Sequence, residues 1–181
     1  MKKLLMFLGE IILIFGLIEI ANAALIDRGG GLIYDSDQNI TWLQDANLAA
    51  TETFGVPGIY GGQMTWDTAQ AWIAAMNATD YKGYNDWRLP TTVDGQYLFG
   101  CDGTTTGGYN IITSEMGYMY YVNLENLGQY ATDGTNPQPG WGLTNTGPFT
   151  NLRSSYYWSG TDYSPIPNGA WLFHFGYGRP S

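Results

Sequence analysis

The stretch LIYDSDQNITWL, residues 32–43, determines the first element of the fold. Its two apolar runs, residues 32–34 and 40–43, contain the β-branched and aromatic side chains that are typical of strands. Between them lies DSDQN, residues 35–39, which is rich in the Asp, Ser and Asn residues that favour turns. The stretch therefore predicts a β-hairpin near the start of the chain.

The same turn also resembles the start of a calcium-binding EF-hand loop. Such a loop needs glycine at its sixth position and a bidentate glutamate at its twelfth, whereas this chain has Ile40 and Ala46 there. A hairpin turn is therefore the better interpretation. No cofactor is predicted, and calcium stays open only as an option, because no metal ligands can be named.

Two segments after the hairpin have helical periodicity. In the first, Thr65–Ala78, Thr65 is a good N-cap and Asp67 lies at the positive end of the helix dipole. Its apolar residues recur at helical spacing and predict a stripe that faces the core: Trp66, Ala69, Trp72 or Ile73, and Met76. The second segment, Ser114–Leu127, has Ser114 as its cap, although Gly117 lowers its helix propensity.

Two strands are predicted late in the chain, Tyr156–Ser159 and Ala170–Phe175. The second alternates, with Trp171, Phe173 and Phe175 on one face. The order is thus hairpin, helix, helix, long loops and strands, which differs from a βαβ repeat. It predicts a loop-rich α+β domain with a small antiparallel sheet.

The composition excludes some functions. The chain has 181 residues, of which 44% are hydrophobic and 15% aromatic, and this is too apolar for a disordered tail. It carries 16 Asp and Glu against 7 Lys and Arg, for a net charge of −9. Because this charge repels phosphate backbones, we expect no nucleic-acid partner.

Residues 1–23 have the pattern of an export signal. Lys2 and Lys3 precede an apolar run, and Ala21-Asn22-Ala23 is a small-x-small cleavage site. The alternative is an uncleaved membrane anchor, although Glu10 and Glu19 would be costly inside a bilayer. We expect cleavage before Ala24, a single domain over residues 24–181 without a membrane span, and an extracytoplasmic location: secreted, periplasmic or at the cell surface.

Residues suited to catalysis are few. Cys101 is the only cysteine and His174 the only histidine. In an oxidising compartment, Cys101 either stays free or pairs between chains, which leaves a homo-oligomer open. Asp86 and Arg88 flank Trp87 and predict a hydrogen-bond network around a core indole, while Glu115 is interpreted as a charge in the first turn of a helix.

The loop-rich region that follows residue 130 offers a better candidate for ligand binding. Aromatic side chains stand there beside amides and carboxylates, and this combination suits sugars, which have apolar C–H faces and hydroxyl groups. The alternative is that these aromatic residues pack the loops onto the core. The predicted ligand-binding residues are Trp141, Asn151, Tyr156, Tyr157, Asp162 and Tyr163.

An ordered series of motifs runs along the chain, at residues 25–35, 41–47, 64–66, 87–91, 114–117, 147–152, 157–161 and 170–171. The series is specific as a whole, although each motif alone is not. It resembles the Lcl C-terminal domain family of exported bacterial proteins.

The resemblance implies a fold similar to C-type lectins and formylglycine-generating enzymes, in which two helices flank a small twisted antiparallel sheet. It also implies an adhesin-type surface module that binds glycans. Members of the family usually continue past the segment of Ala170-Trp171 into a closing strand. We therefore expect the edge beside Ala170–Phe175 to be unpaired, with low stability or a strand from a partner. Members often carry a second cysteine as well, which this chain lacks.

Three functions follow from these observations. The leading hypothesis is a non-catalytic binding or adhesion module for glycans at the bacterial surface. The alternatives are an enzyme on a formylglycine-generating-enzyme-like fold, which lacks the cysteine pair that such chemistry needs, and a structural component of a surface assembly. Because few cations are free to meet anions, we expect neutral glycans, or a ligand bridged by a divalent cation, rather than sulfated polymers.

Overall fold

The computed structural model describes residues 25–181, so the predicted export signal lies outside the described residues. It contains two short three-stranded antiparallel sheets, a two-stranded parallel pair and two α-helices. The elements are β1 Leu25–Gly29, β2 Leu32–Asp35, β3 Ile40–Leu43, α1 Trp66–Ala78, β4 Phe99–Gly100, β5 Gly107–Gly108, α2 Glu115–Tyr118, β6 Tyr156–Asp162, β7 Ala170–His174 and β8 Arg179–Pro180. The 3₁₀ turns are Leu48–Ala50 and Tyr81–Gly83, and a π-turn covers Met119–Asn123.

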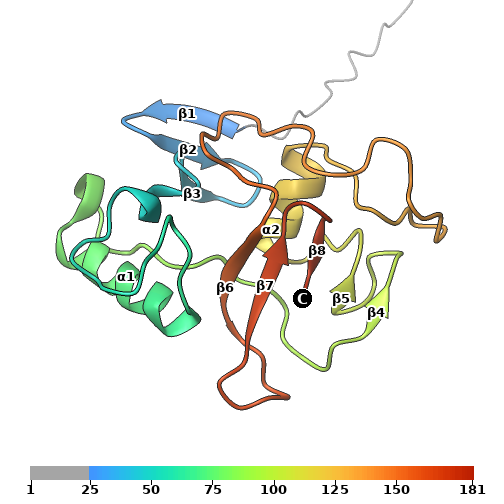
Figure 1. Cartoon of the computed structure of the whole chain (residues 1–181). Coiled ribbons are helices and arrows are strands. Elements are labelled where there is room, and N and C mark those ends of the chain that lie inside the picture. Colours follow the sequence, from blue (N-terminus) through green and yellow to red (C-terminus); the bar gives the residue numbers. More distant parts are fainter. Residues whose placement is uncertain (1–24) are drawn as a thin grey trace, which may run out of the picture.

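The mixed α/β class and the hairpin are confirmed. β2 pairs with β3 in an antiparallel register, and β1 adds a third strand. The Asp35 carboxylate accepts bonds from Asp37 N and Gln38 N, so DSDQN forms a turn. The expectation of one small sheet is wrong, because the β1–β2–β3 and β6–β7–β8 sheets are separate, with α1 and the β4–β5 pair on opposite sides of the β6–β7–β8 sheet (Figure 1).

The first helix forms as predicted. Thr65 is its N-cap, and the Thr65 side chain accepts a hydrogen bond from Thr68 N. Long-range bonds attach the start of α1 to β6: Trp66 Nε1 donates to Ser159 O at 2.8 Å, and Trp158 Nε1 donates to Met64 O at 2.9 Å. Two indoles thereby fix the helix beside the C-terminal sheet.

The second helix is shorter than predicted. α2 is capped by Ser114, and the helical backbone continues through the π-turn but ends before Leu127. Glu125 follows with a φ of 53°, a left-handed conformation that no right-handed helix tolerates. The apolar spacing that predicted the helix continues past Glu125, but the backbone turns there and buries the Asn126 side chain.

The expectation of an unpaired edge beside Ala170–Phe175 is wrong for residues 172–174. β7 ends at His174, where Tyr177 N and Gly178 N donate to His174 O and turn the chain back. β8 then pairs with Phe173 and His174, and Ser181 exchanges two backbone bonds with Leu172. Arg179 therefore lies half-buried in a strand.

The core consists of two separate hydrophobic clusters. The larger lies between β2, α2, the π-turn and β7 and is built from Ile33, Met116, Met119, Tyr120, Leu124, Phe149, Phe173 and Phe175. The smaller lies under α1 and is built from Ala49, Trp72 and Met76. Residues of both clusters border one cavity, so the seam between the clusters is incompletely filled.

Candidate functional site

The cavity at this seam has a volume of about 550 Å³, within the range of small-molecule sites. Its walls come from β3 and the loop after it, α1, the 87–90 segment, α2 and the 149–158 segment. Four indoles contribute to the lining: Trp42, Trp72, Trp87 and Trp158. The cavity is therefore mostly apolar, with few polar groups at its border.

The polar border is formed by segments more than a hundred residues apart. The Asp45 carboxylate accepts hydrogen bonds from Asn47 N and Asn151 Nδ2, both at 2.9 Å. Backbone bonds from Ala46 N to Thr150 O and from Thr150 N to Gln44 O join the same two segments. The loop after β3 and the loop before β6 thus form one unit.

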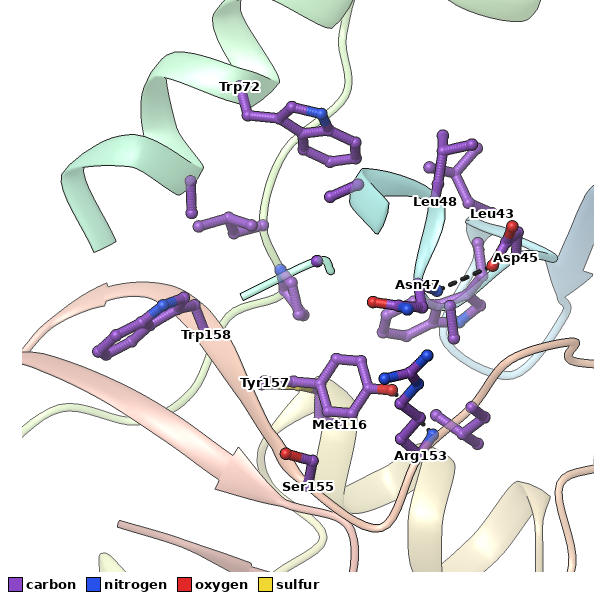
Figure 2. Close-up of a pocket in the computed structure, with 18 of the residues that line it drawn as sticks. Leu43, Asp45, Asn47, Leu48, Trp72, Met116, Arg153, Ser155, Tyr157 and Trp158 are labelled. Carbon is purple, nitrogen blue, oxygen red and sulfur yellow. Dashed lines mark hydrogen bonds between the residues drawn. The ribbon is translucent and has the colours of Figure 1, made fainter. Parts of the chain in front are cut away.

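Arg153 and Tyr157 lie opposite this loop. Arg153 N donates to the Tyr157 hydroxyl at 2.9 Å, and Figure 2 shows both side chains extending into the space below Asp45 and Asn47. Burial raises the pKa of Tyr157, an effect that the Arg153 charge partly opposes and Asp45 reinforces. The phenol therefore stays a neutral hydroxyl at physiological pH, next to one cation and one anion.

A second hollow of about 430 Å³ adjoins the cavity and shares Trp42, Trp87 and Arg88 with it. Arg88 forms a two-pronged ion pair with Glu115, with N–O distances of 2.7 and 2.6 Å. Trp87 is held by other bonds, from its Nε1 to Tyr81 O and from its N to Asn77 Oδ1. The predicted pairing of Asp86 with Arg88 is wrong, because the partner of Arg88 is Glu115. Burial raises the pKa of Glu115, yet the Arg88 and Thr91 bonds outweigh it, so that the net pKa is lowered.

The six predicted ligand-binding residues do not form a single cluster. Tyr156 and Tyr157 line the cavity, and Asn151 supports its border through Asp45. Asp162 and Tyr163 lie at the far end of β6, where the Tyr163 ring packs edge-on against Trp171. The cavity residues Asp45, Asn47 and Arg153 were not predicted, because no sequence motif joins segments so far apart.

Trp141 and Tyr156 belong to a row of neighbouring rings on the outer surface, which we call the aromatic row: Tyr156, His174, Tyr177 and Trp141. Consecutive ring centroids are 4.2, 4.4 and 5.8 Å apart. Neither His174 nor Tyr177 was among the predicted ligand-binding residues. The alternation of β7 was an available signal, since it places His174 on the face opposite Phe173.

The His174 ring holds the turn that carries Tyr177. Its Nδ1 accepts from Gly176 N at 2.9 Å and from Tyr177 N at 3.3 Å. A nitrogen that accepts these bonds must be unprotonated, so the neutral imidazole carries its proton on Nε2. Burial lowers the pKa of His174; a backbone hydrogen bond opposes this shift, and the nearby Arg179 charge adds to it.

This lowered pKa makes stability depend on pH. In the unfolded chain His174 takes up a proton near its ordinary pKa of 6.5, whereas the folded chain resists protonation to a lower pH. The contribution is fully present above about pH 6.5 and is lost as pH falls toward the folded pKa. We expect wild type to lose more free energy of unfolding between about pH 7.5 and 5 than His174→Asn, whose Oδ1 accepts the same bonds without titrating. If urea titrations show that wild type and His174→Asn lose the same free energy of unfolding over this pH range, His174 is not the titrating group.

Two features are absent from residues 25–181, the part of the chain that the structure describes. Over this range, no three His, Cys, Asp or Glu side chains gather closely enough to hold a metal ion. The helices within the same range are all too short or too polar to cross a bilayer.

A comparison with family models matches residues 31–181 to the Lcl C-terminal domain. No curated protein and no solved structure matches the chain. The family match begins within the first hairpin and includes α1, the indole-lined cavity and both strands of the late pair. The chain therefore belongs to the Lcl C-terminal domain family.

Proposed function

We propose that this domain is an exported, non-catalytic binding module for glycans at the bacterial surface, and that its ligand enters the cavity at the seam of the two hydrophobic clusters. The observation that carries the proposal is the lining of that cavity: four indoles together with Asp45, Asn47, Arg153 and Tyr157 at one border. A sugar ring offers apolar C–H faces to indoles and hydroxyls to charged and amide groups.

The charge distribution favours a neutral sugar. Arg153 is exposed at the cavity, but Asp45 stands across from it, so the local charges offset each other. Arg28 lies over the Tyr34 ring at 3.8 Å, and Arg88 is paired with Glu115. With a net charge of −9 on the chain, long-range attraction has the wrong sign for a polyanion.

We also infer that the fold is C-type-lectin-like, with an extracytoplasmic location. The fold inference is supported by the order of elements, in which an N-terminal hairpin, two helices and a late antiparallel sheet follow one another. The location is supported by the export pattern of residues 1–23. N-terminal sequencing of the secreted protein should begin at Ala24.

The glycan proposal is tested with an array of neutral and sulfated oligosaccharides, followed by calorimetry on the neutral sugar that binds. Arg153→Ala should weaken binding about tenfold or more, because a hydrogen bond to a charged group is lost. Arg28→Ala is the matched control: it removes the same charge outside the cavity and should leave the affinity unchanged. Binding only to heparin, strengthening at low salt, would overturn the neutral-sugar proposal.

A further inference from the structure

The aromatic row begins at the cavity. Tyr156 lines the cavity and also packs edge-on against His174, with ring centroids 4.2 Å apart. From there the rings of Tyr177 and Trp141 continue over the surface, the last two nearly parallel at 8°. A ligand that leaves the cavity past Tyr156 therefore meets the remaining rings of the row.

The row occupies the outer face of the C-terminal sheet. β6 and β7 alternate, so Tyr157 and Phe173 contact the larger cluster, while the paired residues Tyr156 and His174 face the other way. Tyr156 is 55% exposed, and Trp141 and Tyr177 are each 36% exposed. Large aromatic surfaces left open in a contiguous row mark a binding surface.

The rings are held in place before any ligand arrives. The His174 ring fixes the turn of Tyr177, as described above. Trp141 is positioned by bridges to Leu127, including a backbone bond of 2.9 Å from Gly142 N to Leu127 O. Such preorganisation reduces the entropy lost on binding, because rings with few rotatable bonds are already ordered.

The charges near the row suit a neutral occupant. The Arg179 guanidinium lies 5.8 Å from the Tyr177 ring centroid and 6.0 Å from that of Tyr109. It is therefore already engaged in cation–π contacts with two rings of the protein. Aromatic rings without a free charge provide stacking surfaces for the apolar faces of sugars and no specific site for sulfate or carboxylate groups.

We infer that the aromatic row is a second subsite for the same glycan: the terminal unit enters the cavity, and the following neutral sugar units stack along Tyr177 and Trp141. The inference rests on the proposed function and deepens it, because it assigns the ligand class as a chain of several units and not a single sugar. Continuity through Tyr156 is what joins the two subsites.

The test uses the neutral series found on the array and compares its disaccharide with its hexasaccharide by calorimetry. Wild type should bind the hexasaccharide about tenfold more tightly than the disaccharide, because only the longer chain reaches the rings of Tyr177 and Trp141 and gains affinity by stacking on them. In Trp141→Ala and Tyr177→Ala this preference should disappear while the disaccharide affinity stays within about twofold. Tyr60→Ala, which removes an exposed ring elsewhere, is the matched control.

The outcomes separate the two proposals. Equal affinity of wild type for both sugars, with Arg153→Ala still weakening both, would overturn the row subsite and leave the cavity proposal standing. Absence of binding to either sugar would overturn both. Sedimentation that shows a dimer of the wild type, abolished by Trp141→Ala, would show that a second copy of the chain covers the row and would also overturn the inference.

Discussion

Replacing Asn126 with alanine should lower the free energy of unfolding by about 3 kcal/mol or more. The Asn126 side chain is 1% exposed and makes four hydrogen bonds. Its Oδ1 accepts from Thr144 N, Thr144 Oγ1 and Asn145 N, and its Nδ2 donates to Asn145 O, at 2.8–3.1 Å. Alanine would leave three backbone groups of the Trp141 loop without these partners, and each such loss costs about 1–3 kcal/mol.

Urea unfolding followed by tryptophan fluorescence measures this change. Asn126→Asp retains Oδ1 but replaces the donor toward Asn145 O with an acceptor, so it should destabilise the fold as well. Asn85→Ala, at an exposed position, is the control and should change stability by less than about 0.5 kcal/mol. A loss below about 1 kcal/mol for Asn126→Ala would mean that water replaces the amide.

The elements that could be predicted from sequence are those set by local interactions. The hairpin follows from two apolar runs around a turn-rich pentapeptide, and α1 follows from its Thr65 cap and apolar spacing. Both depend on contacts between residues a few positions apart. The order of these elements was sufficient for the α+β class.

Features that depend on distant contacts could not be predicted. Glu125 adopts a left-handed backbone although nothing in the apolar spacing signals it, and the second helix therefore ends early. β8 has only two residues, too few for a recognisable pattern, and its pairing with β7 was missed for this reason.

The candidate site was predictable only in part, for the same reason. Aromatic and amide residues in the late loops pointed to Tyr156, Tyr157 and Asn151, which do lie at or beside the cavity. Their partners Asp45 and Asn47 come from the loop after β3. The two loops meet through backbone bonds at Thr150 and through the side-chain bond from Asn151 to Asp45. A spacing of that length carries no periodic signal.

At Gly117, helix propensity and tertiary contacts predict opposite changes in stability when the glycine is replaced by alanine. Alanine is favoured over glycine by about 1 kcal/mol inside a helix, so propensity alone predicts that Gly117→Ala stabilises α2. A Cβ at this position would lie 2.6 Å from Ser114 Oγ and still closer to the carbonyl oxygen of Ile111. The site is buried, so neither the cap nor the Ile111 backbone can move away freely.

We therefore expect Gly117→Ala to lower the free energy of unfolding by about 2 kcal/mol, as overpacking of a core does, and Gly117→Val to lower it further. The graded pair separates the two causes, because helix propensity favours alanine and a steric clash grows with side-chain volume. Thermal and urea unfolding measure both variants. A rise in the melting temperature of Gly117→Ala would show that Ile111 moves aside and that the close approach is not required. A loss of stability for both variants would show instead that the glycine is needed for the contact of α2 with the segment before it. This contact accounts for a weak helix former at the last position of the SEMG motif, residues 114–117.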